Sequence, residues 1–320
     1  MISVGDKRKK VIEEKETFSG TWPYQARYFE GKGFRQHYVD EGSKDSAETF
    51  VCLHGEPTWG YIYRNFIPKL SEIGRVVVPD HMGFGKSETP QERDYSIEEH
   101  CDNLDALLLS LDLRDVTLVM QDWGGPIGSN FAFRHPDRIK RLFFIDSFTR
   151  VGLPSGIEMA VLAKEGNTPW AQFFSSDEFE PVMNHLCRTI LSVLKLIGFV
   201  NHQIISDEWI RAYASPFPTP ESCKGAKAFP LNTINPVSWS YLEAQMKQPG
   251  VIEAMRTKPA MTVIGEEDRS LPPILARAFL HEIWPDAPFI TLPNVGHFAQ
   301  EDAPGTLVAM IEQFVRSPFG

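Results

Sequence analysis

The chain has few cysteines and lacks any hydrophobic run long enough to span a membrane. Its 320 residues include only four cysteines, and none of them has Cys-x-x-Cys spacing. We therefore expect free, buried thiols rather than disulfides or a metal site, and a cytoplasmic location. The longest apolar run, residues 189–200, is interrupted by Lys195 and is too short to cross a bilayer. No membrane partner is expected.

An excess of positive charge is also absent. The chain carries 32 Lys and Arg against 42 Asp and Glu, so its formal net charge is −10. Nucleic acids and anionic membranes usually bind basic surfaces, so this balance argues against both as partners. The basic residues 7–10 are not followed by the apolar core of a signal peptide. We expect residues 1–20 to form a loosely held lead-in.

Short β-branched apolar runs alternate with helical patterns along much of the chain. One such pattern covers residues 96–110, where apolar side chains recur at helical spacing. Strands that alternate with helices predict an α/β fold with a mostly parallel sheet covered on both faces. The candidate strands are residues 35–40, 49–53, 75–79, 116–121, 141–145, 260–264 and 287–292.

The strand pattern is interrupted between residues 152 and 240. This stretch contains helical patterns and the proline-rich sequence Ser-Pro-Phe-Pro-Thr-Pro at 215–220. We expect a helical cap at 152–240, inserted into a core formed by residues 1–151 and 241–320. The alternative is a loop-rich extension of the core itself. A cap would cover the carboxyl ends of the strands, where open α/β sheets place their sites.

The most informative position is Asp122. Residues 118–125 read Leu-Val-Met-Gln-Asp-Trp-Gly-Gly, an apolar run followed by one exposed group and two glycines that open a helix. This pattern is typical of a nucleophile elbow, with aspartate where a serine hydrolase carries serine. A carboxylate is suited to attack on a saturated carbon, with loss of a leaving group and formation of an alkyl ester. The sequence therefore favours cleavage of a carbon–halogen or strained carbon–oxygen bond.

Such a nucleophile needs a base and an acid, and on this fold the order is nucleophile, acid, histidine. His297 follows the last candidate strand and is the predicted base that activates water. Asp268 ends Thr-Val-Ile-Gly-Glu-Glu-Asp and is the predicted acid, which would fix the tautomer of the histidine. Asp146, at the end of the preceding candidate strand, is an alternative acid.

Backbone N–H groups should stabilise the oxyanion that forms when water attacks the ester. We expect them from Trp123 and from the His54–Trp59 loop, which contains Glu56. The indole N–H of Trp123 is a donor without an acceptor, so it is also suited to stabilise a departing halide.

With these residues in place, the chain resembles the haloalkane dehalogenases of the α/β-hydrolase superfamily. The resemblance rests on His-Gly-Glu-Pro-Thr-Trp-Gly-Tyr-Ile-Tyr-Arg at 54–64, on residues 79–87 and on Gln-Asp-Trp-Gly-Gly at 121–125. It implies an α/β-hydrolase fold, with a mostly parallel eight-stranded sheet flanked by helices and an inserted helical cap. It also implies a two-step hydrolysis of small apolar halogenated substrates to an alcohol and a halide ion, with no cofactor or metal.

The resemblance leaves one part of the site open. Members use two halide donors, of which one is matched by Trp123. The second is an Asn in the His-Gly-x-Pro turn or a Trp of the cap, and this turn carries Glu56. Anchoring on residues 212–218 places the expected Trp near residues 182–184, where the sequence has none. Trp170 is the nearest tryptophan, and would reach the site only if the cap is rearranged.

Two other functions follow from the same residues. An epoxide hydrolase would use Asp122 and His297 together with cap tyrosines that donate to the epoxide oxygen, for which Tyr213 and Tyr241 are available. A non-catalytic binding protein of the same fold is the third reading, and the intact set of nucleophile, acid and base argues against it.

Overall fold

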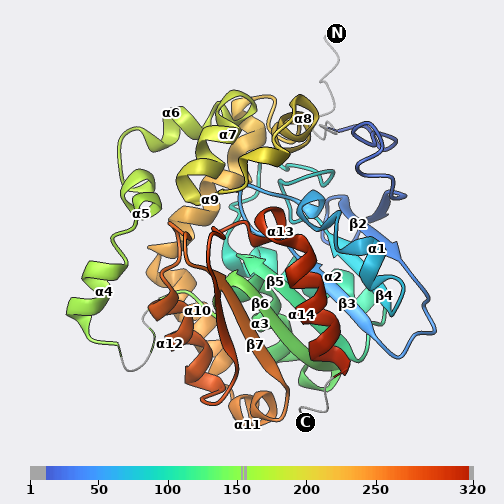
Figure 1. The fold of residues 1–320 in the computed structure, drawn as a ribbon, viewed down its shortest axis with the longest axis vertical. Helices are drawn as coiled ribbons and strands as arrows, with labels where there is room; N and C mark the ends of the chain where they lie inside the picture. The colour runs from blue at the N-terminus through green and yellow to red at the C-terminus, as the bar shows by residue number, and fades with distance from the viewer. Residues whose placement is uncertain (1–11, 153, 155–156, 317–320) are drawn as a thin grey trace.

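The computed structural model describes residues 12–152, 154 and 157–316, and a single sheet organises it (Figure 1). The strand order is β1-β2-β4-β3-β5-β6-β7-β8. Strands β3 to β8 pair in parallel, whereas β2 is antiparallel to both β1 and β4. The prediction of an α/β fold with a mostly parallel eight-stranded sheet is therefore confirmed. The strands are β1 (Arg27–Phe29), β2 (Gln36–Glu41), β3 (Thr49–Leu53), β4 (Arg75–Pro79), β5 (Val116–Asp122), β6 (Ile139–Ser147), β7 (Ala260–Gly265) and β8 (Phe289–Leu292).

Helices cover both faces of this sheet. In Figure 1, α14 (Pro304–Arg316) crosses in front of the strands, and α2 (Ile97–Ser110) and α3 (Gly124–Arg134) lie behind them. Every residue of β3 and of β5 is buried. Continuous burial explains why these strands read as apolar runs rather than as an alternating pattern. The remaining core helices are α1 (Ile67–Leu70), α12 (Pro273–Ile283) and α13 (Ala299–Asp302), with 3₁₀ turns η1 (Gly60–Tyr63) and η2 (Pro136–Arg138).

Helix α2 illustrates how the sequence sets a boundary. The side chain of Ser96 accepts a hydrogen bond from the backbone N–H of Glu99, so it caps the first turn. Ile97, Cys101 and Leu104 are buried, and α2 packs against α3 and α10. The amphipathic pattern at residues 96–110 thus forms the expected helix.

The segment between β6 and β7 is helical, and its described residues contain no strand. Helices α6 to α9 gather beyond one end of the sheet in Figure 1, while α10 packs against α2 and α3. The cap boundary expected at residue 240 lies inside α10, and residues 153 and 155–156 lie outside the described residues. The elements are α4 (Met159–Glu165), α5 (Pro169–Phe174), α6 (Phe179–Met183), α7 (Leu186–Ile197), η3 (His202–Ile204), α8 (Asp207–Ala214), η4 (Pro220–Cys223), α9 (Lys224–Thr233), α10 (Pro236–Met246) and α11 (Val251–Arg256).

The structure also bears on what the sequence predicted about the cysteines, membrane-spanning segments and the N-terminal residues. The four cysteines are unpaired, and three of them are buried. Across the described residues, none of the helices combines the length and apolar character needed to cross a membrane. Residues 1–11 of the expected lead-in lie outside the part of the chain that the structure describes.

Candidate active site

The elbow at Asp122 is formed by a sharp turn from β5 into α3. Asp122 is the last residue of the strand and has a φ of +49°, which is unusual for a residue other than glycine. Such strain is characteristic of residues that a fold holds in place for function. Two residues later, a Cβ on Gly124 would lie 2.4 Å from the carbonyl oxygen of Leu53, so only glycine lets α3 begin this close to β3.

Backbone amides hold one oxygen of the Asp122 carboxylate. Its Oδ1 accepts hydrogen bonds from the N–H of Trp123 at 2.6 Å and from the N–H of Glu56 at 3.4 Å. These are the two N–H groups that the sequence predicted for an oxyanion hole, and both converge on the same atom. The side chain of Asp122 is only 8% exposed, so little solvent competes for these bonds.

His297 and Asp268 form a chain of hydrogen bonds that ends at Asp122. The Nε2 atom of His297 is 3.2 Å from Oδ2 of Asp122, and its Nδ1 is 2.9 Å from Oδ2 of Asp268. The other oxygen of Asp268 accepts from the N–H groups of Ser270 at 2.7 Å and Leu271 at 2.9 Å. A carboxylate fixed in this way orients the imidazole and sets its tautomer.

The two carboxylates determine the protonation of His297. Burial by itself lowers the pKa of the imidazole, but the negative charges of Asp268 and Asp122 outweigh burial and raise that pKa well above its ordinary value. His297 is fully buried. Its ability to act as a base therefore depends on how many of its two neighbours are charged.

The structure places the alternative acid, Asp146, differently. It is fully buried at the end of β6, and its Oδ1 accepts from the backbone N–H of Gly265 at 2.7 Å. Its Oδ2 has no hydrogen-bond partner among the described residues. Burial and the charge of Asp268 raise the pKa of Asp146 well above its usual range. Of the two candidates, it is Asp268 that hydrogen-bonds to His297.

Glu56 is a buried residue next to Asp122, and it carries a carboxyl group of its own. It is 1% exposed, and neither of its carboxyl oxygens has a hydrogen-bond partner among the described residues. Burial and the negative charge of Asp122 raise the pKa of Glu56 well above its usual range, which favours the neutral acid. The backbone of Glu56 therefore binds Asp122 while its side chain adds no second negative charge.

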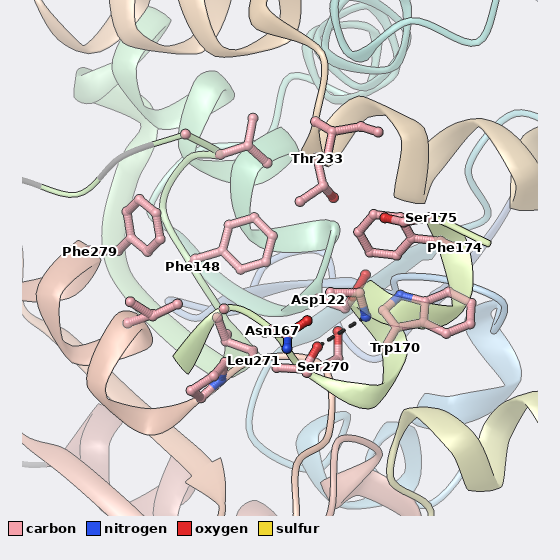
Figure 2. A pocket seen from close by; sticks show the side chains of 18 of the residues that line it. Asp122, Phe148, Asn167, Trp170, Phe174, Ser175, Thr233, Ser270, Leu271 and Phe279 are labelled. Atoms are coloured by element: carbon pink, nitrogen blue, oxygen red, sulfur yellow. Dashed lines mark hydrogen bonds between the residues drawn. The ribbon is translucent and has the colours of Figure 1, made fainter. Parts of the chain in front are cut away.

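Asp122 forms part of the wall of a cavity of about 460 Å³ (Figure 2). Trp170 and Phe174 lie to one side of Asp122, and Phe148 and Phe279 lie to the other. Asp122 is the sole ionisable side chain among the described residues that line the cavity. The polar contributions come from neutral groups, namely Asn167, Thr168, Ser175, Thr233 and Ser270.

The structure places Trp170 at this cavity, whereas the spacing from residues 212–218 predicted a tryptophan near residues 182–184. Trp170 and Trp123 both line the cavity, and neither indole N–H is hydrogen-bonded within the described part of the chain. The segment near residues 182–184 is not in the lining, and Met183 is buried in the core. The pair Thr168-Pro169 was the sequence signal that could have located Trp170, because it marks the start of a helix. Thr168 caps α5, so Trp170 lies in the first turn of that helix.

The other aromatic candidates use their polar atoms elsewhere. Trp239 lines the cavity, but its indole N–H donates to the carbonyl of Thr233 at 2.6 Å. The hydroxyl of Tyr213 donates to Glu301, and the hydroxyl of Tyr241 accepts from Arg134. Neither tyrosine lines the cavity, so the donors that an epoxide hydrolase would need are not supplied by these two residues.

Comparison with known proteins first defines the class. Residues 48–304 match the model of the alpha/beta hydrolase fold family, to which the chain belongs. Within that class, the chain is 35% identical over 294 residues to a haloalkane dehalogenase of Psychrobacter cryohalolentis, with 89% of each chain covered. The tetrameric haloalkane dehalogenase DpaA from Paraglaciecola agarilytica NO2 superposes with a TM-score of 0.77 at 29% identity, covering 98% of this chain and 100% of that one. The chain is therefore a member of the haloalkane dehalogenase family.

A shorter match lies outside that family name. A cis-3-alkyl-4-alkyloxetan-2-one decarboxylase of Shewanella oneidensis is 39% identical over 128 residues, which is 39% of either chain. Because the match covers a minority of both proteins, it does not change the family assignment.

Proposed function

We propose that this protein is a haloalkane dehalogenase that hydrolyses the carbon–halogen bond of neutral halogenated alkanes to an alcohol and a halide ion. The observation that carries this proposal is a single ionisable group, Asp122, in an otherwise uncharged cavity with a buried His297–Asp268 pair behind it. A carboxylate in such a place is a nucleophile toward a saturated carbon. In this proposal Asp122 is the nucleophile, His297 the base and Asp268 the acid that orients the base.

The first step is displacement of halide. A carboxylate oxygen of Asp122 forms a bond to carbon, and the halogen leaves with the electron pair of the carbon–halogen bond. The negative charge thus moves from Asp122 to the halide, and donors that reach the halide stabilise the transition state more than the substrate. Among the donors that line this cavity are the indole N–H groups of Trp123 and Trp170, which have no hydrogen-bond partner in the described part of the chain.

The second step is hydrolysis of the ester. Esterified Asp122 is neutral, so His297 keeps only the charge of Asp268 and its pKa falls toward the range that suits a base at neutral pH. His297 then takes a proton from water, and the hydroxide oxygen attacks the ester carbonyl. The N–H groups of Trp123 and Glu56 are placed to stabilise the oxyanion. Collapse restores the carboxylate and releases the alcohol, and the proton passes from His297 to solvent.

The cavity also limits the substrate class. Its aromatic walls favour apolar groups, and the charge of Asp122 disfavours anions such as haloacids. A volume of about 460 Å³ is within the range of ordinary ligand pockets and admits more than a two-carbon haloalkane. Under this proposal, halide is the other ligand of the site, no cofactor, metal or nucleic acid takes part, and the protein works in the cytoplasm with residues 152–240 as its cap.

A substrate panel with a trapping variant tests this proposal. The wild-type protein is incubated with bromoalkanes, chloroalkanes, a 1,2-epoxide and a cis-β-lactone, and the release of halide, diol and carbon dioxide is measured. His297→Ala should form the ester and fail to hydrolyse it, so the intact mass increases by one alkyl group per chain. His297→Ala combined with Asp122→Asn is the matched control and should show no adduct. Absence of both halide release and adduct with every haloalkane would contradict the proposal.

A further inference from the structure

Two loops carry the proposed acid and base of the site. The acid loop, residues 266–272, contains Asp268, and the base loop, residues 293–298, contains His297. Each follows a strand of the sheet, and the side chains meet only if both loop backbones are held in place. The end of helix α7, beyond one end of the sheet in Figure 1, is hydrogen-bonded to both loops.

Helix α7 meets the two loops through the carbonyl groups at its end. The carbonyl oxygen of Gly198 accepts a hydrogen bond from the backbone N–H of His297 at 3.0 Å. The carbonyl oxygen of Ile197 accepts from the backbone N–H of Arg269, the residue after Asp268, also at 3.0 Å. Carbonyl groups at the end of a helix lack partners within it, so these bonds satisfy them. One helix end therefore holds both loops.

Gly198 lies too close to these loops for a side chain. Its φ of +135° is one that residues with a side chain rarely adopt. A Cβ there would lie 3.1 Å from the carbonyl oxygen of Glu267 and 3.1 Å from the backbone nitrogen of His297. On the facing side, a Cβ on Gly296 would overlap the carbonyl oxygen of Gly198. The backbones of the three segments are therefore in direct contact at this point.

The carboxylate of Asp302, at the end of α13, makes a second connection of the same kind. Its Oδ1 accepts from the backbone N–H groups of Val200 at 3.2 Å and Asn201 at 2.7 Å, just after α7. Its Oδ2 accepts from the N–H of Gly296 at 2.8 Å, directly before His297. The side chain of Asp302 thus bridges the end of α7 and the base loop.

We propose that residues 197–201 and Asp302, together the α7 clamp, position the catalytic base by holding the backbone of His297 so that its imidazole stays between Asp268 and Asp122. This inference rests on the proposed dehalogenase mechanism and concerns its second step. Attack of Asp122 on the substrate does not use His297, whereas hydrolysis of the ester does. A displaced base loop should therefore slow hydrolysis selectively, because small misplacements of a reacting group are costly.

The two loops do not depend on the α7 clamp equally. The carbonyl oxygen of Arg269 also accepts from the backbone N–H of Trp170 at 3.4 Å, so α5 supports the acid loop as well. In the base loop, the consecutive N–H groups of Gly296 and His297 both donate to the clamp. Disturbing the clamp should therefore move the base more than the acid.

Single-turnover reactions of two variants test this inference. Gly198→Ala adds a methyl group between the loops, and Asp302→Asn turns one acceptor oxygen into an amide that faces backbone N–H groups. Ester formation from a bromoalkane and ester hydrolysis are measured separately by quench and intact mass. We expect hydrolysis to slow about 10- to 100-fold in each variant, while ester formation stays within about threefold of wild type. Asp268→Asn is the positive control, because loss of the acid should also slow hydrolysis selectively.

Gly250→Ala and Asp105→Asn are the matched controls. Gly250 has a φ of +79°, and a Cβ there would meet no atom within 4 Å, so alanine adds backbone strain away from both loops. Asp105 is buried on α2 and pairs with Arg134 at 2.8 Å, so asparagine there removes a buried carboxylate elsewhere in the protein. Both controls should lower the melting temperature and leave the ratio of hydrolysis to ester formation unchanged.

The outcomes separate this inference from the proposed function. Clamp variants that slow both steps alike, or that lower the melting temperature with the wild-type ratio of the two rates, would show that the clamp has a structural role alone and overturn the inference. If Gly198→Ala does not fold, the nearly isosteric Asp302→Asn decides the question. Failure of the dehalogenase proposal would appear earlier, as absence of the ester in the wild-type and His297→Ala proteins.

Discussion

The inner side of the cavity and its outer walls are held in place by different forces. The carboxylates of Asp122 and Asp268 accept hydrogen bonds from backbone N–H groups. The backbone of His297 is held at both ends, because its N–H donates to Gly198 and its carbonyl oxygen accepts from the side chain of Gln121. The walls contributed by α5 are instead held by aromatic packing, such as Trp170 against Phe173 at 5.5 Å between ring centroids. Chemistry at a carbon centre needs atoms placed within fractions of an ångström, which directional bonds provide. Selection among apolar substrates needs only shape, which packing provides.

Removal of the nucleophile should have the largest effect. Asp122→Asn keeps the size of the side chain but replaces the attacking carboxylate with an amide, so halide release should fall at least about 10⁴-fold. Steady-state halide assays measure the loss, and thermal unfolding provides the folding control. If Asp122→Asn folds correctly and keeps more than about one per cent of the activity, Asp122 is not the nucleophile.

Trp170 tests whether the wall takes part in the chemistry. Trp170→Phe keeps an aromatic ring but removes the indole N–H, and the loss of one hydrogen bond to a developing halide should lower kcat/KM about 10- to 100-fold. The matched control is Trp239→Phe, because that indole N–H is already bonded to Thr233. Equal effects of the two substitutions would mean that Trp170 contributes packing alone. Chloride and bromide affinity, measured by tryptophan fluorescence, should weaken in Trp170→Phe.

A smaller effect on stability is expected from His100, which is linked to Trp123 through Phe229. His100 is fully buried, packs against Phe229 with centroids 4.5 Å apart, and Phe229 stacks on Trp123 at 5.1 Å. Burial lowers the pKa of His100 to about 3. In the unfolded chain the pKa of His100 returns to its ordinary value of 6.5. The unfolded state therefore binds a proton more readily than the folded state. As a result, the free energy of unfolding is unaffected by His100 above pH 6.5 and decreases as the pH falls from there toward 3.

Acid unfolding of a variant measures that contribution. Each such histidine should destabilise the fold by up to about 1.4 kcal/mol per pH unit below about 6.5, so His100→Asn should show a shallower slope of unfolding free energy against pH. Substitution of the exposed His185 by Asn is the control and should leave the slope unchanged. A slope in His100→Asn as steep as that of wild type would locate the acid sensitivity elsewhere, for example at the buried His81.

Sequence reasoning located the hydrogen-bonded side of the site better than the walls. Asp122 ends a strand, and Asp268 and His297 come shortly after strands. The carboxyl ends of parallel strands lie at one edge of the sheet, so the structure brings these three side chains together as expected. Their catalytic roles stay predictions that the variants above test. Strand β1 was missed because Arg27–Phe29 is a half-buried run of three residues without an apolar pattern.

The walls were harder to predict because they depend on how short helices pack. The sequence admitted Trp170 as the second halide donor only if the cap is rearranged. The spacing from residues 212–218 placed that donor near residues 182–184 instead. Its position follows from the start of α5, where its backbone N–H donates to the carbonyl oxygen of Arg269 at 3.4 Å. Contacts between segments a hundred residues apart leave no local trace in a sequence, whereas a helix cap does.

Gly124 has a consequence for how this protein can diversify. A single added methyl group there would meet the backbone of the central strand β3, so even alanine requires the sheet to move. Substitutions at this turn, which would shift Asp122, therefore destabilise the fold. They are lost because the protein does not fold, whatever their effect on activity. The apolar residues of the α5 wall meet no such barrier, because shape changes among packed side chains are tolerated more readily. Over generations, new substrates are thus open to exploration while the reaction itself is conserved by the fold.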